Sequence, residues 1–175
     1  MGETQERAVN PHPLDPLDAG EVAAAAGIAR DSDHFRALSG DSRFITIALA
    51  EPHKQAVLEW ETGGDRPARE AELVILDRGS GCTVEALVSF EPPGVASWTL
   101  RDDVQPMAVV SELMEAEEAV RLDPDFQAAM ALRGVTDFDT VQVDAWPAGH
   151  FGPAEETGQR LSRAVAFIKP KPGDS

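Results

Sequence analysis

Four short runs rich in Val, Ile, Leu and Phe occupy much of the first half of the chain, at residues 43–50, 69–77, 82–90 and 95–100. Turn-forming sequences separate the later runs, Asp-Arg-Gly-Ser-Gly at 77–81 and Glu-Pro-Pro-Gly at 91–94. Runs of this length joined by tight turns are typical of neighbouring antiparallel strands. The pattern therefore predicts a four-stranded meander, and residues 55–61 are interpreted as an extension of its first hairpin.

A helix is predicted ahead of these strands. Asp18 is followed three residues later by Glu21, the spacing of a capping box, and residues 22–30 are rich in alanine. Residues 31–42 are expected to form a loop. A helix followed by an antiparallel meander forms an α+β unit, in which the helix covers one face of the sheet.

A second unit of the same plan is predicted to follow. It has a helix at 110–121, a helix at 124–133 that Asp123 caps and Gly134 ends, and strands at 138–144 and 161–169. Residues 68–76 and 160–168 take corresponding places in the two units. The fold class is thus α+β, with two tandem units of a helix on an antiparallel sheet, the second lacking its last strands. The predicted divisions are a flexible arm at 1–11, a first domain at 12–105 and a second at 106–175.

The strand predicted at 161–169 has no later strand to pair with. An unpaired edge and a partly uncovered apolar face are poorly tolerated in small domains. We therefore expect this segment to make the protein prone to self-association.

Composition limits the classes of partner. The net charge is −16 and the pI is near 4.5, which places a repulsive field between this surface and nucleic acid or anionic lipid. The longest apolar stretch, at 22–29, is too short to span a bilayer, and no apolar run of a secretory signal follows Met1. We expect a cytoplasmic protein with no nucleic-acid or membrane partner. The single cysteine, Cys82, is interpreted as a small buried hydrophobe.

Other candidates for chemistry have simpler interpretations. Acidic pairs such as Asp102-Asp103 lack the ligand pattern of a calcium loop and are expected to be solvated surface charge. His34 beside Asp31 and Asp33, and His150 near Asp144, could form acid/base pairs, but no nucleophile motif accompanies either. Three methionines are interpreted as lying on helical segments, where core packing is favoured over copper ligation: Met107, Met114 and Met130.

Several short motifs occur in an order that resembles one enzyme family. They are His-Pro-Leu-Asp-Pro-Leu at 12–17, Arg-Gly-Val-Thr-Asp at 133–137, Trp-Pro-Ala-Gly-His-Phe-Gly at 146–152, Gln-Arg-Leu at 159–161 and Pro-Gly-Asp at 172–174. Their order and spacing resemble the two small, non-catalytic N-terminal domains of copper-containing primary-amine oxidases. The resemblance implies two domains of cystatin-like topology, each with a helix packed on a four-stranded antiparallel sheet.

The resemblance also implies a reaction, the oxidative deamination of primary amines to aldehyde, ammonia and hydrogen peroxide. The family uses copper and topaquinone, which is made from a tyrosine, and holds the copper with three histidines that include a His-x-His pair. This sequence has no tyrosine, and no two of its histidines have that spacing: His12, His34, His53 and His150. No catalytic, cofactor-binding or metal-binding residue of the family can therefore be carried over. We expect the chain alone to be non-catalytic, with a separately encoded amine-oxidase catalytic domain or a second copy as its partner.

One non-catalytic role is implied by the resemblance. Asp144, Ala145 and Trp146 correspond to a turn that lies toward the family's substrate entry route. The alternative is that Trp146 is a core aromatic that anchors the turn. For the chain as a whole, the alternative function is a free-standing small-ligand-binding domain with a curved sheet.

Overall fold

The computed structural model describes residues 12–149, 152–156 and 159–169. The chain divides into two compact units, Met1–Val104 and Gln105–Ser175. Each unit is described by itself below. Among the described residues, no helix has the length and apolar character needed to cross a membrane.

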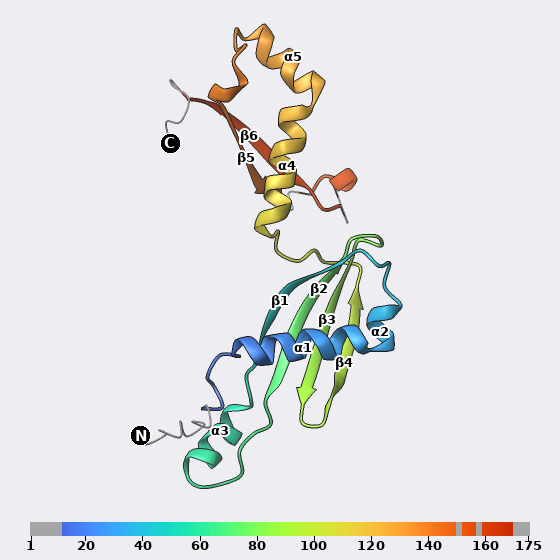
Figure 1. Ribbon diagram of the computed structural model, residues 1–175, viewed down its shortest axis with the longest axis vertical. Coiled ribbons are helices and arrows are strands. Elements are labelled where there is room, and N and C mark those ends of the chain that lie inside the picture. The colour runs from blue at the N-terminus through green and yellow to red at the C-terminus, as the bar shows by residue number, and fades with distance from the viewer. Residues whose placement is uncertain (1–11, 150–151, 157–158, 170–175) are drawn as a thin grey trace, which may run out of the picture. The chain divides into compact units, whose positions relative to one another are not determined.

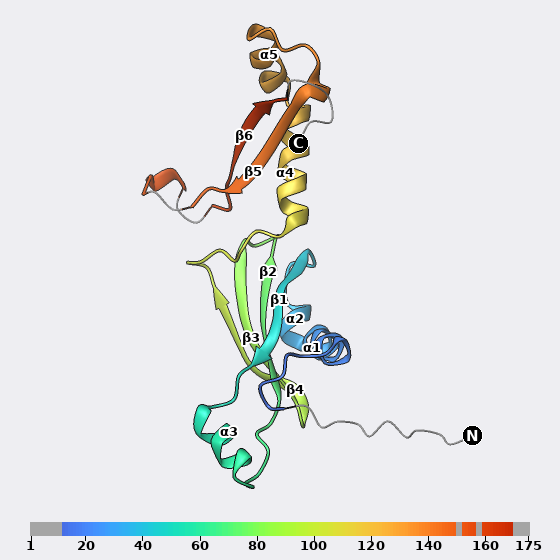
Figure 2. The same ribbon diagram turned by 90° about the vertical axis from the view of Figure 1, so that its left-hand side faces the viewer.

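The first unit is a helix on a four-stranded antiparallel sheet, as the sequence predicts (Figure 1). Its strands lie side by side in chain order, and α1 and α2 lie on one side of the sheet (Figure 2). The elements are α1 (Ala19–Asp31), α2 (Asp33–Arg36), β1 (Ser42–Ala50), α3 (Lys54–Glu61), β2 (Glu70–Asp77), β3 (Cys82–Phe90) and β4 (Pro93–Arg101).

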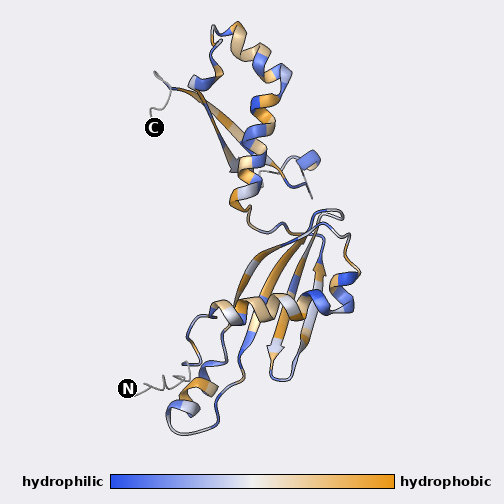
Figure 3. Ribbon diagram, viewed as in Figure 1, coloured by the Kyte–Doolittle hydropathy of each residue, from blue (hydrophilic) through white to orange (hydrophobic). Residues whose placement is uncertain are grey.

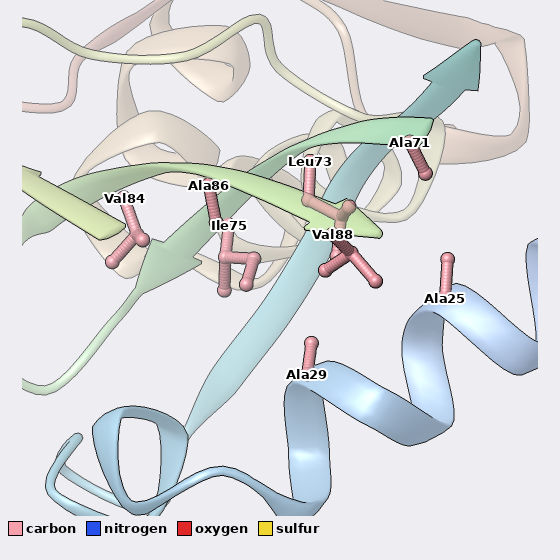
Figure 4. Close-up of a cluster of buried hydrophobic side chains, with 8 residues drawn as sticks. All are labelled: Ala25, Ala29, Ala71, Leu73, Ile75, Val84, Ala86 and Val88. Carbon is pink, nitrogen blue, oxygen red and sulfur yellow. The ribbon is translucent and has the colours of Figure 1, made fainter. Parts of the chain in front are cut away.

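Alternate residues of the central strands form the core of the first unit. Leu73 of β2 lies between Ile47 of β1 and Ala86 of β3. On the same face, Ala25 and Ala29 of α1 are fully buried against the sheet (Figure 4). Their small side chains allow the helix to lie close to the sheet, whose central strands β2 and β3 are mainly apolar (Figure 3). This packing explains why a helix with so many alanines contributes to a stable core.

The start of α1 confirms the predicted capping box. The Asp18 carboxylate accepts the backbone N–H of Glu21 at 2.8 Å, and the Glu21 carboxylate accepts the backbone N–H of Asp18 at 3.0 Å. Two donors that the first turn of a helix leaves unpaired are thereby satisfied.

The interpretation of residues 55–61 as a strand extension is wrong. They belong to α3, in which the Gln55 amide donates to the Glu59 carboxylate at 3.0 Å and Val57 is buried. Gln, Ala, Leu and Glu have high helix propensity, and side chains four residues apart meet only on a helix. The expected loop at 31–42 likewise contains α2, which Ser32 caps through the N–H of Phe35.

The described residues of the second unit form two helices and a two-stranded antiparallel sheet. Its elements are α4 (Val110–Leu122), α5 (Pro124–Leu132), β5 (Val141–Pro147) and β6 (Ser162–Ile168), with 3₁₀ turns at Phe138–Thr140 and Ala154–Glu156. Met130 of α5 is buried with Val141 and Val143 of β5. Asp123 caps α5, and Gly134 has a φ of 81°, so both predicted boundaries of this helix are confirmed. The paired strand starts at Val141 rather than 138, because the Asp137 carboxylate accepts the N–H of Asp139 and holds the 3₁₀ turn.

Two expectations about burial are wrong. Met107 and Met114 are 74% and 63% exposed, so of the three methionines only Met130 packs in a core. Cys82 is partly exposed, because it opens β3 beside the hairpin turn, opposite Asp77. Trp146 is 61% exposed in this chain, so none of the described residues buries it in a core.

Candidate functional site

Arg69 joins the beginning of β2 to the beginning of α1. Its side chain is 9% exposed, and its Nε and Nη2 donate to the two Glu21 carboxylate oxygens at 2.7 and 2.9 Å. The same guanidinium donates to the backbone carbonyls of His12, Pro13, Asp15 and Pro16. The hydrogen bond from Arg69 lowers the pKa of Glu21, and the bond to Glu21 raises the pKa of Arg69.

Arg160 makes the corresponding connection in the second unit. Its Nε and Nη2 donate to the two Glu112 carboxylate oxygens at 2.8 and 2.7 Å, and its Nη1 donates to the carbonyl of Pro106 at 2.7 Å. Glu112 also accepts the backbone N–H of Val109, the N-cap of α4, at 3.0 Å. The sequence places 68–76 and 160–168 in corresponding positions, but the two ion pairs were not predicted. One sequence feature could have indicated these ion pairs. In both units a glutamate in the first turn of a helix is followed 48 residues later by an arginine.

Asp77 forms a buried polar centre at the end of β2. It is 3% exposed and accepts hydrogen bonds from the backbone N–H and hydroxyl of Ser39 and from the hydroxyls of Ser42 and Ser80. Burial alone would raise the pKa of Asp77, but the serine hydrogen bonds outweigh burial and hold the pKa below its ordinary value. This centre ties the segment before β1 to the turn between β2 and β3, because Ser39 lies before β1, Ser42 opens β1 and Ser80 lies in that turn.

The three residues expected to line a substrate route lie at the end of β5. Asp144 and Trp146 are alternate residues and share one face of the strand, whereas Ala145 is buried on the opposite face. The Asp144 carboxylate accepts the Gln142 amide at 2.7 Å, and the Ala145 N–H donates to Glu117 of α4 at 3.4 Å. The structure therefore brings an exposed indole and a carboxylate together on one surface and separates Ala145 from them.

The histidines occupy separate environments. The His12 ring meets Trp60 edge-on at 4.9 Å, and the His34 ring stacks on Trp98 at 5.6 Å. His53 is the N-cap of α3, and His150 lies outside the described residues, so its pairing with Asp144 stays a prediction. Within the part of the chain that the structure describes, no group of three His, Cys, Asp or Glu side chains is placed to hold a metal ion.

An open cleft of about 620 Å³ lies at the start of α1. Gly20 and Ala24 of α1, residues 66–69 and Phe90 at the end of β3 line it. Arg69 and Glu21 are part of its wall, but they are bonded to each other. The cleft is large enough for a small ligand.

Comparison with known families and proteins gives a consistent result. Residues 12–100 match the model "Copper amine oxidase, N2 domain", and residues 111–174 match "Copper amine oxidase, N3 domain". A primary amine oxidase of Arthrobacter sp. (strain P1) is 39% identical over 165 residues, which cover 94% of this chain and 24% of that protein. The peroxisomal primary amine oxidase of Pichia angusta is 33% identical over 135 residues, 75% of this chain and 19% of that protein.

The fold comparison agrees. A copper-containing benzylamine oxidase from Hansenula polymorpha matches 93% of this chain and 26% of its own length with a TM-score of 0.69, at 18% identity. The 175 residues thus span about a quarter of the length of the relatives they match. The family models cover both units, and the resemblance inferred from the short motifs is confirmed. The chain therefore belongs to the copper amine oxidase family, of which it carries the N2 and N3 domains.

Proposed function

We propose that this chain is the non-catalytic N2–N3 part of a primary-amine oxidase, whose reaction converts a primary amine to an aldehyde, ammonia and hydrogen peroxide. The observation that carries the proposal is the match of both units, in order, to the N2 and N3 models. The 39% identity to a primary amine oxidase over nearly the whole chain supports the substrate class.

The residues of this chain do not fit the family's copper and topaquinone. Topaquinone requires a tyrosine, and the sequence has none. His12, His34 and His53 each lie in a different local environment, and the described residues contain no cluster of three ligands. We therefore assign no catalytic step to this chain, and propose that an amine-oxidase catalytic domain outside these 175 residues supplies the copper and the quinone.

Amine-dependent release of hydrogen peroxide tests this proposal. The purified chain is incubated with Cu(II), oxygen and methylamine or benzylamine, while the Arthrobacter primary amine oxidase serves as the positive control. We expect neither peroxide above the no-amine background nor a visible quinone absorption band from the chain. Turnover of either amine by the chain alone would overturn the proposal.

We further propose that Asp144 and Trp146 line the route by which the amine approaches the catalytic domain. The support is their common face at the end of β5 and the 61% exposure of Trp146. An indole face and a carboxylate both attract an alkylammonium ion. In an assembled oxidase containing this chain, Trp146→Ala should raise KM for the amine and leave kcat unchanged, and Trp146→Phe should restore KM. A change in kcat alone would contradict the role.

The cleft at the start of α1 supports a second candidate function, the binding of a small ligand. Amide spectra recorded with a library of small carboxylates and amines test it. If a ligand binds in the cleft, the NMR chemical shifts of the backbone amides of Ala24, Ala68 and Phe90 should change. If the changes occur at other residues, or if no amide shifts at millimolar ligand, this candidate function is rejected.

A further inference from the structure

The imidazole of His12 contacts two different parts of the first unit through its two nitrogens. Its Nδ1 accepts the backbone N–H of Leu14 at 3.2 Å. Its Nε2 lies 3.7 Å from the Oε1 of Glu61, and the ring meets the Trp60 ring edge-on with the centroids 4.9 Å apart. Trp60 and Glu61 are the last two residues of α3. The ring therefore connects the lead-in segment, residues 12–18, to the end of α3.

The contact with Leu14 defines the charge of the ring in this arrangement. A backbone N–H is a donor, so the Nδ1 that accepts it carries no proton, and the proton of the neutral ring lies on Nε2, which faces Glu61. An imidazolium carries a proton on both nitrogens and has no acceptor, so the Leu14 N–H loses its partner when the ring is protonated. The charged ring instead forms an ion pair with Glu61. Protonation thus exchanges a hydrogen bond within the lead-in segment for a stronger contact with α3.

The backbone around His12 is held by contacts that do not involve the ring. The Asp15 carboxylate accepts the His12 N–H at 2.6 Å, and the Asp15 N–H donates to the His12 carbonyl at 2.9 Å. Arg69 donates to the carbonyls of His12 and Pro13 at 3.3 and 3.4 Å, and the Pro13 side chain is fully buried. The lead-in segment therefore stays in place while the imidazole turns away from Leu14.

We propose that His12 is a pH-sensitive switch between the lead-in segment and α3. With a neutral ring the Leu14 N–H is bonded, and with a charged ring the imidazolium is bonded to Glu61. The other charged groups around His12 are the Asp15 carboxylate, which holds the His12 N–H, and the Arg69 guanidinium, which is paired with Glu21. Histidine is the side chain that ordinarily changes its charge between about pH 5 and 8.

The end of α3 should report the charged state. The N–H groups of Thr62 and Gly63 donate to the carbonyls of Glu59 and Trp60 at 3.2 and 3.0 Å and close the last turn of the helix. An ion pair from His12 to Glu61 opposes the opening of this turn. Between about pH 8 and pH 5 we therefore expect the hydrogen-exchange protection factors of Thr62 and Gly63 to rise by about two- to fivefold, the range of an exposed ion pair.

NMR titration of the chain tests the first half of the switch. In the wild type the backbone amide resonance of Leu14 should move together with the ring resonances of His12 as the pH is lowered, because both report the same proton. His12→Asn keeps a side-chain acceptor for the Leu14 N–H but does not titrate, so the Leu14 resonance should stay constant. His34→Gln is the matched control, because His34 stacks on Trp98 instead, and it should leave the Leu14 titration unchanged.

Glu61→Gln tests the second half. The ring still becomes charged and releases Leu14, but it meets a neutral amide, so the rise in protection at Thr62 and Gly63 should disappear. A Leu14 resonance that does not follow the His12 ring overturns the proposal, as does one that moves equally in His12→Asn. The proposal is also overturned if the protection at Thr62 and Gly63 does not rise in the wild type, or rises equally in Glu61→Gln.

Discussion

Arg160 and Glu112 form a bidentate ion pair that fixes the approach to β6 to the first turn of α4, with N–O distances of 2.8 and 2.7 Å. Arg69 and Glu21 form the same pair in the first unit, at 2.7 and 2.9 Å. In both units the glutamate also accepts the N–H of the helix N-cap, and the arginine also binds carbonyls of the segment before the helix. One connection therefore sets the position of helix and strand in each unit.

Removing Arg160 should destabilise the second unit. Arg160→Ala removes two charged hydrogen bonds from the partly buried Glu112 carboxylate, and we expect a loss of about 1.5–3 kcal/mol in the free energy of unfolding. Urea unfolding measures the change, followed by the fluorescence of Trp146 in a background in which the other two tryptophans, Trp60 and Trp98, are replaced by phenylalanine. Arg133→Ala is the matched control, because Arg133 bonds only to a carbonyl of its own helix among the contacts described, and it should cost less than about 0.5 kcal/mol. Equal losses would show that the ion pair has no special role.

The pair Arg69–Glu21 should make stability depend on pH. The hydrogen bond from Arg69 lowers the pKa of Glu21 in the folded state, below its ordinary value of 4.5. The ion pair therefore contributes its full stabilisation of the folded state at pH values above 4.5. This stabilisation is lost as the pH falls through the pKa of Glu21 in the folded state. Arg69→Ala should reduce stability most near pH 7, and the difference from wild type should shrink below pH 4.5. Thermal unfolding across this range checks the sign, and a constant difference would contradict it.

Asp77 should behave as a structural carboxylate. Asp77→Asn keeps the volume of the side chain but presents an amide to the donors of Ser39, Ser42 and Ser80, and should cost about 1–3 kcal/mol near neutral pH. Ser80→Ala removes a single donor and should cost about 1 kcal/mol. Because the pKa of Asp77 is lowered in the folded state, the stabilisation by its carboxylate is lost as the pH falls through this lowered pKa. In Asp77→Asn the free energy of unfolding should therefore decrease less steeply at acidic pH than in the wild type. If the free energy of unfolding of this variant falls as steeply at acidic pH as that of the wild type, Asp77 does not have this role.

Two glycines should respond to alanine with opposite signs. Gly134 has a φ of 81° after α5, so Gly134→Ala should cost about 1 kcal/mol. Gly27 lies inside α1, and a Cβ there meets no atom within 4 Å, so Gly27→Ala should stabilise by about 0.5–1 kcal/mol. Chemical denaturation of the two variants beside wild type measures both changes, and the same sign at both sites would contradict the assignment.

The sequence by itself determined the features that depend on neighbouring residues. The Asp18–Glu21 capping box, the hairpin turn at 77–81 and the stop at Gly134 each follow from side chains within a few positions of one another. Runs rich in Val, Ile, Leu and Phe, separated by turn-forming sequences, placed β1 to β4 and hence the four-stranded sheet. The order of the short motifs was sufficient to identify the family, because these motifs are distributed along both units.

Only the tertiary structure decided features that join distant segments or depend on what covers a surface. Residues 55–61 fold as α3, although a run of seven residues is too short to show a clear helical period in the sequence. The ion pairs of Arg69 and Arg160 join residues 48 positions apart, a separation that no local pattern encodes. The exposure of Trp146 at the end of β5 also depends on which elements cover that face, which the sequence pattern of the strand does not state. Burial is a property of the assembled layers, whereas capping and turn formation are properties of the local chain.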